Sequence, residues 1–207
     1  MGVYIVLVGI AVALKTRQLK VLLYPLSIVT VLSLIFAFSN IKTMQQREIV
    51  VYHIYKNTVV DFIDGQKCYA LSKKYSSKSD TANKIKFAVE NHRMKLKINE
   101  LETCEFNVSE KYPNFIYHFG ISQFQGYKMA ILDNMPTNNL ILNVNTVLLH
   151  QNARLNIADL QQHIRFDSVI FDGSNARWRV EKWKNECRTL HISYYDTSEK
   201  GAWVKQL

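Results

Sequence analysis

The sequence predicts a layered α/β (α+β) domain preceded by two transmembrane helices. Two observations point to this fold class. Apolar residues concentrate at the N-terminus, and beyond it short β-branched and aromatic runs alternate with segments of helical periodicity. With 207 residues, 48% of them hydrophobic, the chain has room for one such domain beside a short membrane segment, and extensive disorder is excluded.

The membrane segment is expected over residues 1–40, which contain no Asp or Glu. A run over about residues 21–39 is long enough to cross a bilayer as a helix, whereas the first run, over about residues 2–14, is too short. We interpret the short run as part of a transmembrane segment of a longer protein, inside which the chain starts. An alternative interpretation makes residues 15–39 a signal peptide with a cleavage site near Ser39.

The basic residues of the membrane segment favour one orientation. They lie between the two apolar runs and are Lys15, Arg17 and Lys20. The positive-inside rule places such a loop in the cytoplasm, so the second helix would run outward. The remainder of the chain is therefore expected on the non-cytoplasmic side.

Residues 41–48 are expected to form a polar connector, and residues 49–207 the extramembrane domain. Within it, β-branched and aromatic runs predict strands, and Asp64-Gly65 predicts a tight turn. We expect strands at residues 49–55, 58–63, 67–71, 114–119, 127–132, 140–149, 167–171, 191–195 and 201–207. Apolar periodicity and the capping residues Asp80 and Asn156 predict helices. We expect them at residues 81–94, 157–164 and 176–190.

Charge and cysteine content limit the classes of partner and site. The net charge is +9, and residues 41–207 keep +6 of it, because 23 basic residues stand there against 17 acidic ones. Such a surplus suits contact with phosphate backbones or anionic lipids, although it also occurs in proteins that bind neither. The three cysteines are far apart, so we expect inert thiols and no zinc site. They are Cys68, Cys104 and Cys187.

Two blocks of the domain resemble a known family. They are IVVYHIYKNTVVDFIDGQKCYAL (residues 49–71) and DSVIFDGSNARWRVEKWKNECRTLHISYYDTSEKGAWV (residues 167–204). Both are similar to the C-terminal region of ComEC-type competence proteins, the channels of natural transformation. The resemblance implies a multi-pass protein of the bacterial inner (cytoplasmic) membrane that passes single-stranded DNA. It also implies a metallo-β-lactamase-like fold, and as partners the remaining transmembrane part of the channel or other competence proteins.

The chain lacks the metal-binding residues that a metallo-β-lactamase-type hydrolase needs. Such enzymes bind metal through an H-x-H-x-D-H cluster, but the corresponding residues 71–87 contain no histidine, and no two histidines of the chain are closer than 13 residues. We therefore expect a degenerate domain with no catalytic residue, no metal and no cofactor. His150 is read as a surface or capping residue, with a surviving metal ligand as the alternative. Asp64 and Asp172 are read as turn residues, and Asp61 is ambiguous.

The helix expected at residues 176–190 is rich in basic residues and tryptophan. Val180, Trp183, Cys187 and Leu190 share one face, which predicts that Trp183 is a core residue. Arg177, Lys184 and Arg188 are then expected on a solvated basic surface. Cations beside aromatic rings suit single-stranded DNA. The candidate nucleic-acid contacts are Arg177, Trp178, Arg179, Lys182, Lys184 and Arg188.

From residues and resemblance together, the expected function is that of the C-terminal part of a DNA-uptake channel. Its soluble domain would handle DNA or act as a scaffold without catalysis. Two alternatives remain open. The domain could be a metal-dependent nuclease of the metallo-β-lactamase type, or a membrane-anchored interaction module unrelated to DNA.

Overall fold

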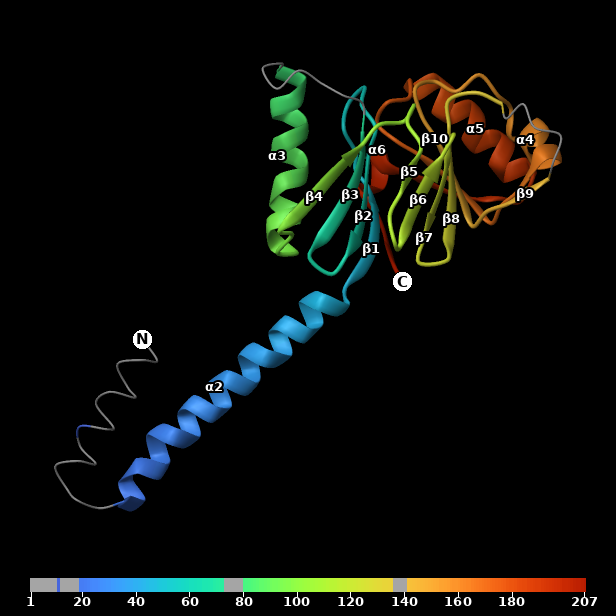
Figure 1. Cartoon of the computed structure of the whole chain (residues 1–207). Coiled ribbons are helices and arrows are strands. Elements are labelled where there is room, and N and C mark those ends of the chain that lie inside the picture. The colour runs from blue at the N-terminus through green and yellow to red at the C-terminus, as the bar shows by residue number, and fades with distance from the viewer. Residues whose placement is uncertain (1–10, 12–18, 73–79, 136–140) are drawn as a thin grey trace. The chain divides into compact units, whose positions relative to one another are not determined.

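The computed structural model describes residue 11 and residues 19–72, 80–135 and 141–207 (Figure 1). The chain divides into two compact units, Met1–Gln45 and Gln46–Leu207. The helix expected at residues 2–14 lies, apart from residue 11, outside the described residues.

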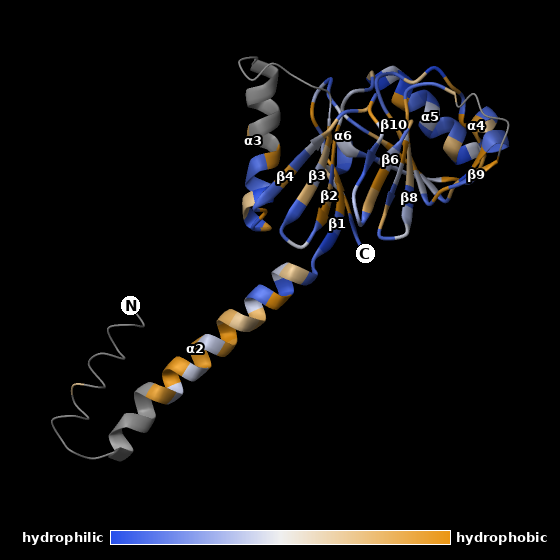
Figure 2. Ribbon diagram, viewed as in Figure 1, coloured by the Kyte–Doolittle hydropathy of each residue, from blue (hydrophilic) through white to orange (hydrophobic). Residues whose placement is uncertain are grey.

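The first unit contains helix α2 (Leu19–Gln45), which confirms the helix expected at residues 21–39. Its segment Leu26–Gln45 is long and apolar enough to cross a membrane, and it is the one such segment among the described residues. Figure 2 shows hydrophobic residues along this helix. Residues 41–45 are helical and not the expected connector, because no Gly or Pro interrupts them and Lys42 sits favourably at the helix C-terminus.

The second unit begins with a five-stranded sheet in the order β14-β1-β2-β3-β4. Its strands are β1 (Arg47–Val51), β2 (Val59–Asp64), β3 (Lys67–Ser72), β4 (Glu100–Cys104) and β14 (Trp203–Gln206). Helix α3 (Asp80–Lys95) connects β3 to β4, which pair in parallel as such a crossover requires. The other neighbours in this sheet are antiparallel.

A seven-stranded sheet follows, in the order β13-β12-β10-β8-β7-β6-β5. Its strands are β5 (Glu110–Lys111), β6 (Phe115–His118), β7 (Ile121–Phe124), β8 (Tyr127–Leu132), β10 (Thr146–Leu149), β12 (Ser168–Phe171) and β13 (Ser193–Asp196). The last four run parallel. The small elements around them are β9 (Leu142–Asn143), β11 (Ile164–Arg165), α4 (Ile157–His163), α5 (Arg177–Thr189) and α6 (Thr197–Lys200).

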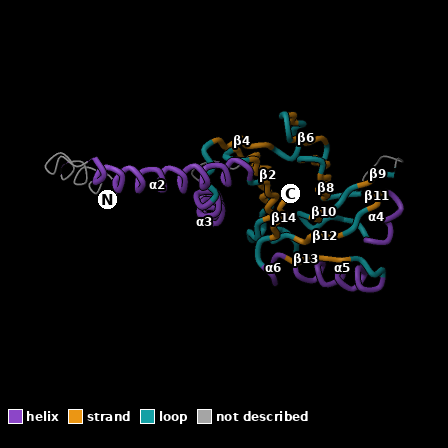
Figure 3. Tube along the Cα trace, turned by 90° about the horizontal axis from the view of Figure 1, so that it is seen from below, coloured by secondary structure: helices purple, strands orange, loops and turns teal. Residues whose placement is uncertain are grey.

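Three apolar clusters join these elements into layers. The central one packs the two sheets face to face, with Phe62 of β2 against Phe115 and Phe124. A second places Trp183 of α5 and Leu160 of α4 on the outer face of the seven-stranded sheet. A third, which includes Val89, places α3 on the outer face of the five-stranded sheet. Figures 1 and 3 show α3 and α5 on opposite sides of the two sheets. The predicted layered α+β domain is confirmed.

The structure also corrects the expected elements in places. The elements that were not predicted are β4, β5, β7, β11 and α6. β4 is a charged edge strand with little buried surface, and the others are at most four residues long. The strand expected at residues 49–55 begins two residues earlier and ends at Val51. The run at residues 140–149 contains two short strands, β9 and β10, and residue 140 lies outside the described residues.

Candidate functional site at the carboxyl ends of the parallel strands

Polar residues follow the four parallel strands at their carboxyl ends. Asp133, His150 and Asp172 directly follow β8, β10 and β12. Asp196 is the last residue of β13. Because these strands are parallel neighbours, their carboxyl ends meet at one edge of the sheet. This edge is where α/β sheets commonly bind ligands.

The loop between β1 and β2 reaches the same edge and packs tightly against the turn after β12. The backbone N–H of Lys56 donates to the carbonyl of Gly173 at 2.8 Å. A Cβ atom at Gly173 would lie 2.6 Å from the carbonyl oxygen of Ile54 and 3.0 Å from His53 Nδ1. The glycine is therefore required by the close approach of two backbones.

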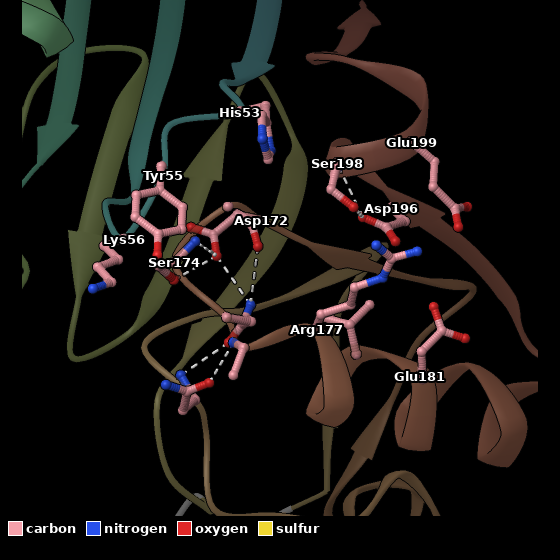
Figure 4. Close-up of a pocket in the computed structure, with 15 residues that line it drawn as sticks. His53, Tyr55, Lys56, Asp172, Ser174, Arg177, Glu181, Asp196, Ser198 and Glu199 are labelled. Carbon is pink, nitrogen blue, oxygen red and sulfur yellow. Dashed lines mark hydrogen bonds between the residues drawn. The ribbon is translucent and has the colours of Figure 1, made fainter.

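A cavity of about 600 Å³ opens beside this contact. It is bounded by the β1–β2 loop, the turn at residues 172–176, the first turn of α5 and the residues around Asp196. Figure 4 shows the Arg177 side chain directed toward Asp196. The cavity thus has a wall with Tyr55 and Lys56 and an opposite wall with Glu181 and Glu199.

Asp172 organises the cavity floor. Its buried carboxylate accepts hydrogen bonds from the Thr58 hydroxyl at 2.5 Å, from the Ser174 backbone N–H at 3.1 Å and from the Asn175 amide at 3.0 Å. The bond from Ser174 is the one expected of a turn residue. Burial raises the pKa of Asp172 to about 7, although the hydrogen bonds from Ser174 and Thr58 favour the charged form.

His150 is buried, so its assignment to the surface is wrong. Its Nδ1 lies 3.4 Å from the Thr58 hydroxyl oxygen, and its ring packs on Phe106 with centroids 5.0 Å apart. Burial lowers the pKa of His150 to about 4, against an opposing effect of Asp133. The imidazole is therefore neutral at physiological pH.

Lys184 is also buried and does not belong to a solvated surface, because only 2% of its side chain is exposed. Its Nζ lies 2.6 Å from Asp196, 2.8 Å from Glu199 and 3.0 Å from Glu181. Burial acts against its charge, but the hydrogen bonds that Lys184 donates to Asp196, Glu199 and Glu181 raise its pKa. Burial likewise opposes the charge of Asp196, and bonds from Lys184 and Ser198 hold its pKa below the ordinary value.

These residues do not fit a hydrolytic metal. Among the described residues, the one group of three potential ligands with oxygens within 4.8 Å of one another is Glu181, Asp196 and Glu199. The ammonium of Lys184 contacts all three carboxylates and supplies the positive charge that a metal would. An ion that contacted all three carboxylates would have to compete with this buried ammonium.

The remaining residues of α5 divide between core and surface. Val180, Trp183 and Cys187 are buried, as the spacing predicts, and the Trp183 indole donates to the Leu155 carbonyl at 3.0 Å. Arg177 and Arg188 are exposed, as expected. Arg188 contacts Asn185 at 2.7 Å.

Two of the predicted nucleic-acid contacts form an aromatic–cation pair at the start of α5. Trp178 is 64% exposed, and the Arg179 guanidinium lies 4.7 Å from the centroid of its ring. Arg179 also donates to the Ala153 carbonyl at 3.0 Å, which fixes its position. Lys182 lies farther along the helix and contacts Asn156 and Glu186.

A second pair of this kind was missed by the sequence analysis. Tyr55 is 75% exposed, and Lys56 Nζ lies 5.1 Å from the centroid of its ring. Lys56 has a φ of 59°, typical of a tight turn, and the Asn57 N–H donates to the Ile54 carbonyl. The available signal was a Tyr-Lys-Asn tripeptide, of which Tyr55 was assigned to the end of the strand expected at residues 49–55.

Comparison with known proteins identifies a family. A family model described as ComEC C-terminal domain matches residues 49–207, about three quarters of the chain. No curated protein and no solved structure matches the chain.

Proposed function

Because the chain belongs to the ComEC C-terminal domain family, we propose that its second unit binds single-stranded DNA without cleaving it, as part of a competence DNA-uptake protein. The carrying observation is the two aromatic–cation pairs Tyr55/Lys56 and Trp178/Arg179, in each of which the aromatic ring is exposed. Both pairs are tied to the turn at residues 172–176. Lys56 N–H bonds Gly173, and Arg179 N–H bonds the carbonyl of Ala176.

Such pairs match the chemistry of single-stranded DNA. Unstacked bases lie on exposed aromatic rings, and the adjacent cations meet the phosphates, with little dependence on sequence. The acidic wall of the cavity, Glu181 and Glu199, repels phosphate. We therefore place the strand across the turn and not inside the cavity, with bases on Tyr55 and Trp178.

The Lys184 cluster supports the non-catalytic part of the proposal. Metal-assisted cleavage of a phosphodiester needs an ion that polarises phosphate and activates water. The three carboxylates best grouped for that purpose all contact the ammonium of Lys184, and an ammonium cannot bind and activate water as a metal ion does.

The family associates the chain with a membrane DNA channel, and the apolar segment Leu26–Gln45 is consistent with that location. We further propose that the protein is multi-pass in the inner membrane and that this domain lies on the non-cytoplasmic side. There it would receive single-stranded DNA, beside the remaining transmembrane part of the channel or other competence proteins.

The test is binding of a fluorescent single-stranded oligonucleotide to the full chain in detergent micelles, over a series of salt concentrations. We expect Trp178→Ala to weaken binding about tenfold, the effect of removing one stacked base. Lys56→Ala should weaken binding and reduce the slope against log salt by about one. Phe87→Ala is the matched control, since Phe87 is an exposed aromatic residue of α3.

The same preparation distinguishes the alternatives. Strand cleavage in the presence of Mn²⁺ or Zn²⁺ would overturn the non-catalytic assignment in favour of a nuclease. Absence of binding at low salt would overturn DNA handling altogether and leave a scaffold or interaction module.

A further inference from the structure

Strands β5 to β8 form one end of the seven-stranded sheet, and the outward side of this end is exposed. Successive side chains of a strand point to opposite faces. The inward residues, among them Phe115 and Phe124, are buried between the two sheets. Helices α4 and α5 pack on the outward residues of β8, β10 and β12. The outward residues of β6 and β7, in contrast, belong to none of the three apolar clusters that the described residues form.

The outward residues form a row across these strands, in which each residue pairs with the next. The row runs from β5 to β8 and consists of Lys111, Ile116, Gln123 and Lys128. All four are exposed. Neighbouring strands lie about 4.8 Å apart, so the backbones of the two lysines are about 14 Å apart, at opposite ends of the row. Together with His118 and Phe119 at the end of β6, we call these residues the open sheet face.

The open sheet face has positive charge and no acidic residue among its strand positions. Glu110 is the one acidic residue in β5 to β8, and it pairs with the inward residue Tyr117. Asp133, which follows β8, is next but one to the inward Ile131 and continues on that side. The charge of Asp133 accordingly adds to the effect of burial in raising the pKa of Tyr117. The open sheet face is therefore complementary to an anionic partner.

Phe119 occupies a turn position at which a phenylalanine costs stability. His118 and Ile121 pair across the β6–β7 turn, so Phe119 and Gly120 are its two central residues. Their φ angles are 41° and 83°, and two positive values are typical of a type I′ hairpin turn, which favours Asn-Gly. A bulky residue is uncommon in this conformation. The Phe119 side chain is also 77% exposed, so the core gains little from it and the ring is accessible to a partner.

The Phe119 ring is supported on one side and lies at the edge of the sheet that carries the candidate site. The His118 ring meets it edge to face, with centroids 4.5 Å apart, and His118 Nδ1 lies 2.8 Å from the Ser109 hydroxyl oxygen. The Ile131 N–H donates to the Gly120 carbonyl at 2.6 Å, which places the turn at the carboxyl end of β8. Three strand spacings, about 14 Å, separate β7 from β12, after which the turn at residues 172–176 begins.

We propose that the open sheet face is a second contact surface for single-stranded DNA. One base stacks on Phe119, and phosphates contact Lys111 and Lys128. Exposed aromatic residues on a sheet, with basic residues beside them, are a common platform for single-stranded nucleic acid. The Gln123 amide, in the row between the lysines, offers a hydrogen bond to a base edge.

Two observations favour DNA over an acidic protein as the partner. Ile116 is 39% exposed, so the row offers little apolar area of the kind that forms the centre of a protein interface. The separation of about 14 Å between β7 and β12 also allows one strand to contact Phe119 and the pairs at Tyr55 and Trp178. The inference therefore rests on the proposed function and adds a site to it.

The test is binding of a fluorescent oligothymidylate of about 16 nucleotides to the full chain in detergent micelles. Phe119→Asn should weaken binding about tenfold, the effect of losing one stacked base. The same variant should be at least as stable to denaturant as the unsubstituted chain, because Asn suits the turn. Phe87→Ala is the matched control, since Phe87 of α3 is also 77% exposed and should not affect binding.

The lysines are tested by the salt dependence of the same binding. Lys111→Ala and Lys128→Ala should each reduce the slope of log affinity against log salt by about one. Lys95→Ala, at an exposed position of α3, should leave the slope unchanged.

Ultraviolet cross-linking shows which ring touches the strand. With 5-iododeoxyuridine in the oligonucleotide, we expect a cross-linked peptide that contains Phe119. Binding that Trp178→Ala weakens and Phe119→Asn does not, with no cross-link at Phe119, overturns the inference and leaves the proposed function intact. Weaker binding of Phe119→Asn that accompanies lower stability, again with no cross-link, also overturns it. Absence of binding by the unsubstituted chain overturns the proposed function itself.

Discussion

Two helices cover the two outer faces of this domain, and a buried charge holds each of them in a different way. On α3, the cation Arg93 meets one carboxylate, Asp61, in a bidentate pair that also receives the Tyr52 hydroxyl at 3.0 Å. On α5, the cation Lys184 meets three carboxylates from α5, β13 and α6. The first cluster is balanced in charge, whereas the second carries an excess of negative charge.

The apolar contacts of the two helices differ as well. Of the described side chains of α3, Val89 is the one buried apolar residue. α5 buries Val180, Trp183 and Cys187, and the Trp183 ring stacks on Phe171 at 5.6 Å. Among the described side chains, α3 therefore depends more on its ion pair than α5 does, where the ion pair adds to a larger apolar face.

The largest effect is expected from Asp61→Asn. The substitution leaves Arg93, with 20% of its side chain exposed, without its counter-charge, and breaking a buried pair from one side costs about 3–5 kcal/mol. Chemical denaturation of the full chain in micelles should show this loss, and hydrogen exchange should show α3 loosened while α5 stays protected. The double variant Asp61→Leu/Arg93→Met should recover most of the stability, since no charge is left unpaired. Equal loosening of both helices would contradict the comparison.

Lys184→Met is expected to cost about 3 kcal/mol, the lower end of the range for breaking a buried pair. It leaves Asp196, with 4% of its side chain exposed, without its counter-charge, whereas the half-exposed Glu181 and Glu199 become hydrated. The variant leaves three carboxylates whose oxygens lie within 4.8 Å of one another, a geometry that suits a divalent cation. Added Ca²⁺ or Mn²⁺ should therefore raise the melting temperature of the variant. The unsubstituted chain, which holds its own cation, should not respond, and a variant without response would show that the cluster collapses.

Asp172 and His150 should give opposite pH dependences of stability. The native pKa of Asp172 is about 7 against an ordinary 3.8, so its contribution is present at low pH and is lost as the pH rises from about 4 to 7. The native pKa of His150 is about 4 against an ordinary 6.5, so its contribution is present above 6.5 and is lost as the pH falls toward 4. In the unsubstituted chain the two changes oppose each other.

Single substitutions separate these two effects. Between about pH 4 and 6.5, Asp172→Asn should make the slope of stability against pH more positive than in the unsubstituted chain. His150→Gln should make this slope more negative. Each slope is at most about 1.4 kcal/mol per pH unit, the value for one proton. Denaturant midpoints at several pH values provide the measurement. If both substitutions changed the slope in the same direction, the opposite roles of Asp172 and His150 would be refuted.

The smallest effect is expected from Gln46→Ala, which removes the two bonds to the carbonyls of Gly65 and Leu96. Both bonds are part-buried, and one hydrogen bond contributes about 1 kcal/mol net, so the loss should be about 1–2 kcal/mol. Hydrogen exchange should increase at the end of α3 and not in α5. Gln66→Ala, which removes a bond between exposed side chains, is the control.

Most of the fold follows from local pattern. The runs at residues 58–63, 67–71 and 127–132 became strands β2, β3 and β8 because their β-branched and aromatic residues suit a buried sheet. The edge strand β4 escaped prediction because its ELETC sequence gains its strand conformation from pairing with β3, and four of its five residues stay exposed.

The candidate site was much less predictable. Lys184 follows Trp183 directly, and its helical position puts it at the border of the apolar face, where either burial or exposure is compatible with the spacing. Its burial depends on Asp196 and Glu199, which arrive from β13 and from the unpredicted α6. His150 was likewise assigned to the surface, because Thr58, which contacts it, is 92 residues away in the chain.

The sequence by itself determined the apolar membrane segment, the alternation of strands and helices, the core position of Trp183 and the family, all of which depend on residue type and near-neighbour spacing. The tertiary structure alone decided which charges are buried, which aromatic–cation pairs face one turn, and which end of α3 meets Gln46. These properties depend on contacts such as Thr58 with Asp172, 114 residues apart. Their energies come from burial and pairing, which only the closed layers create.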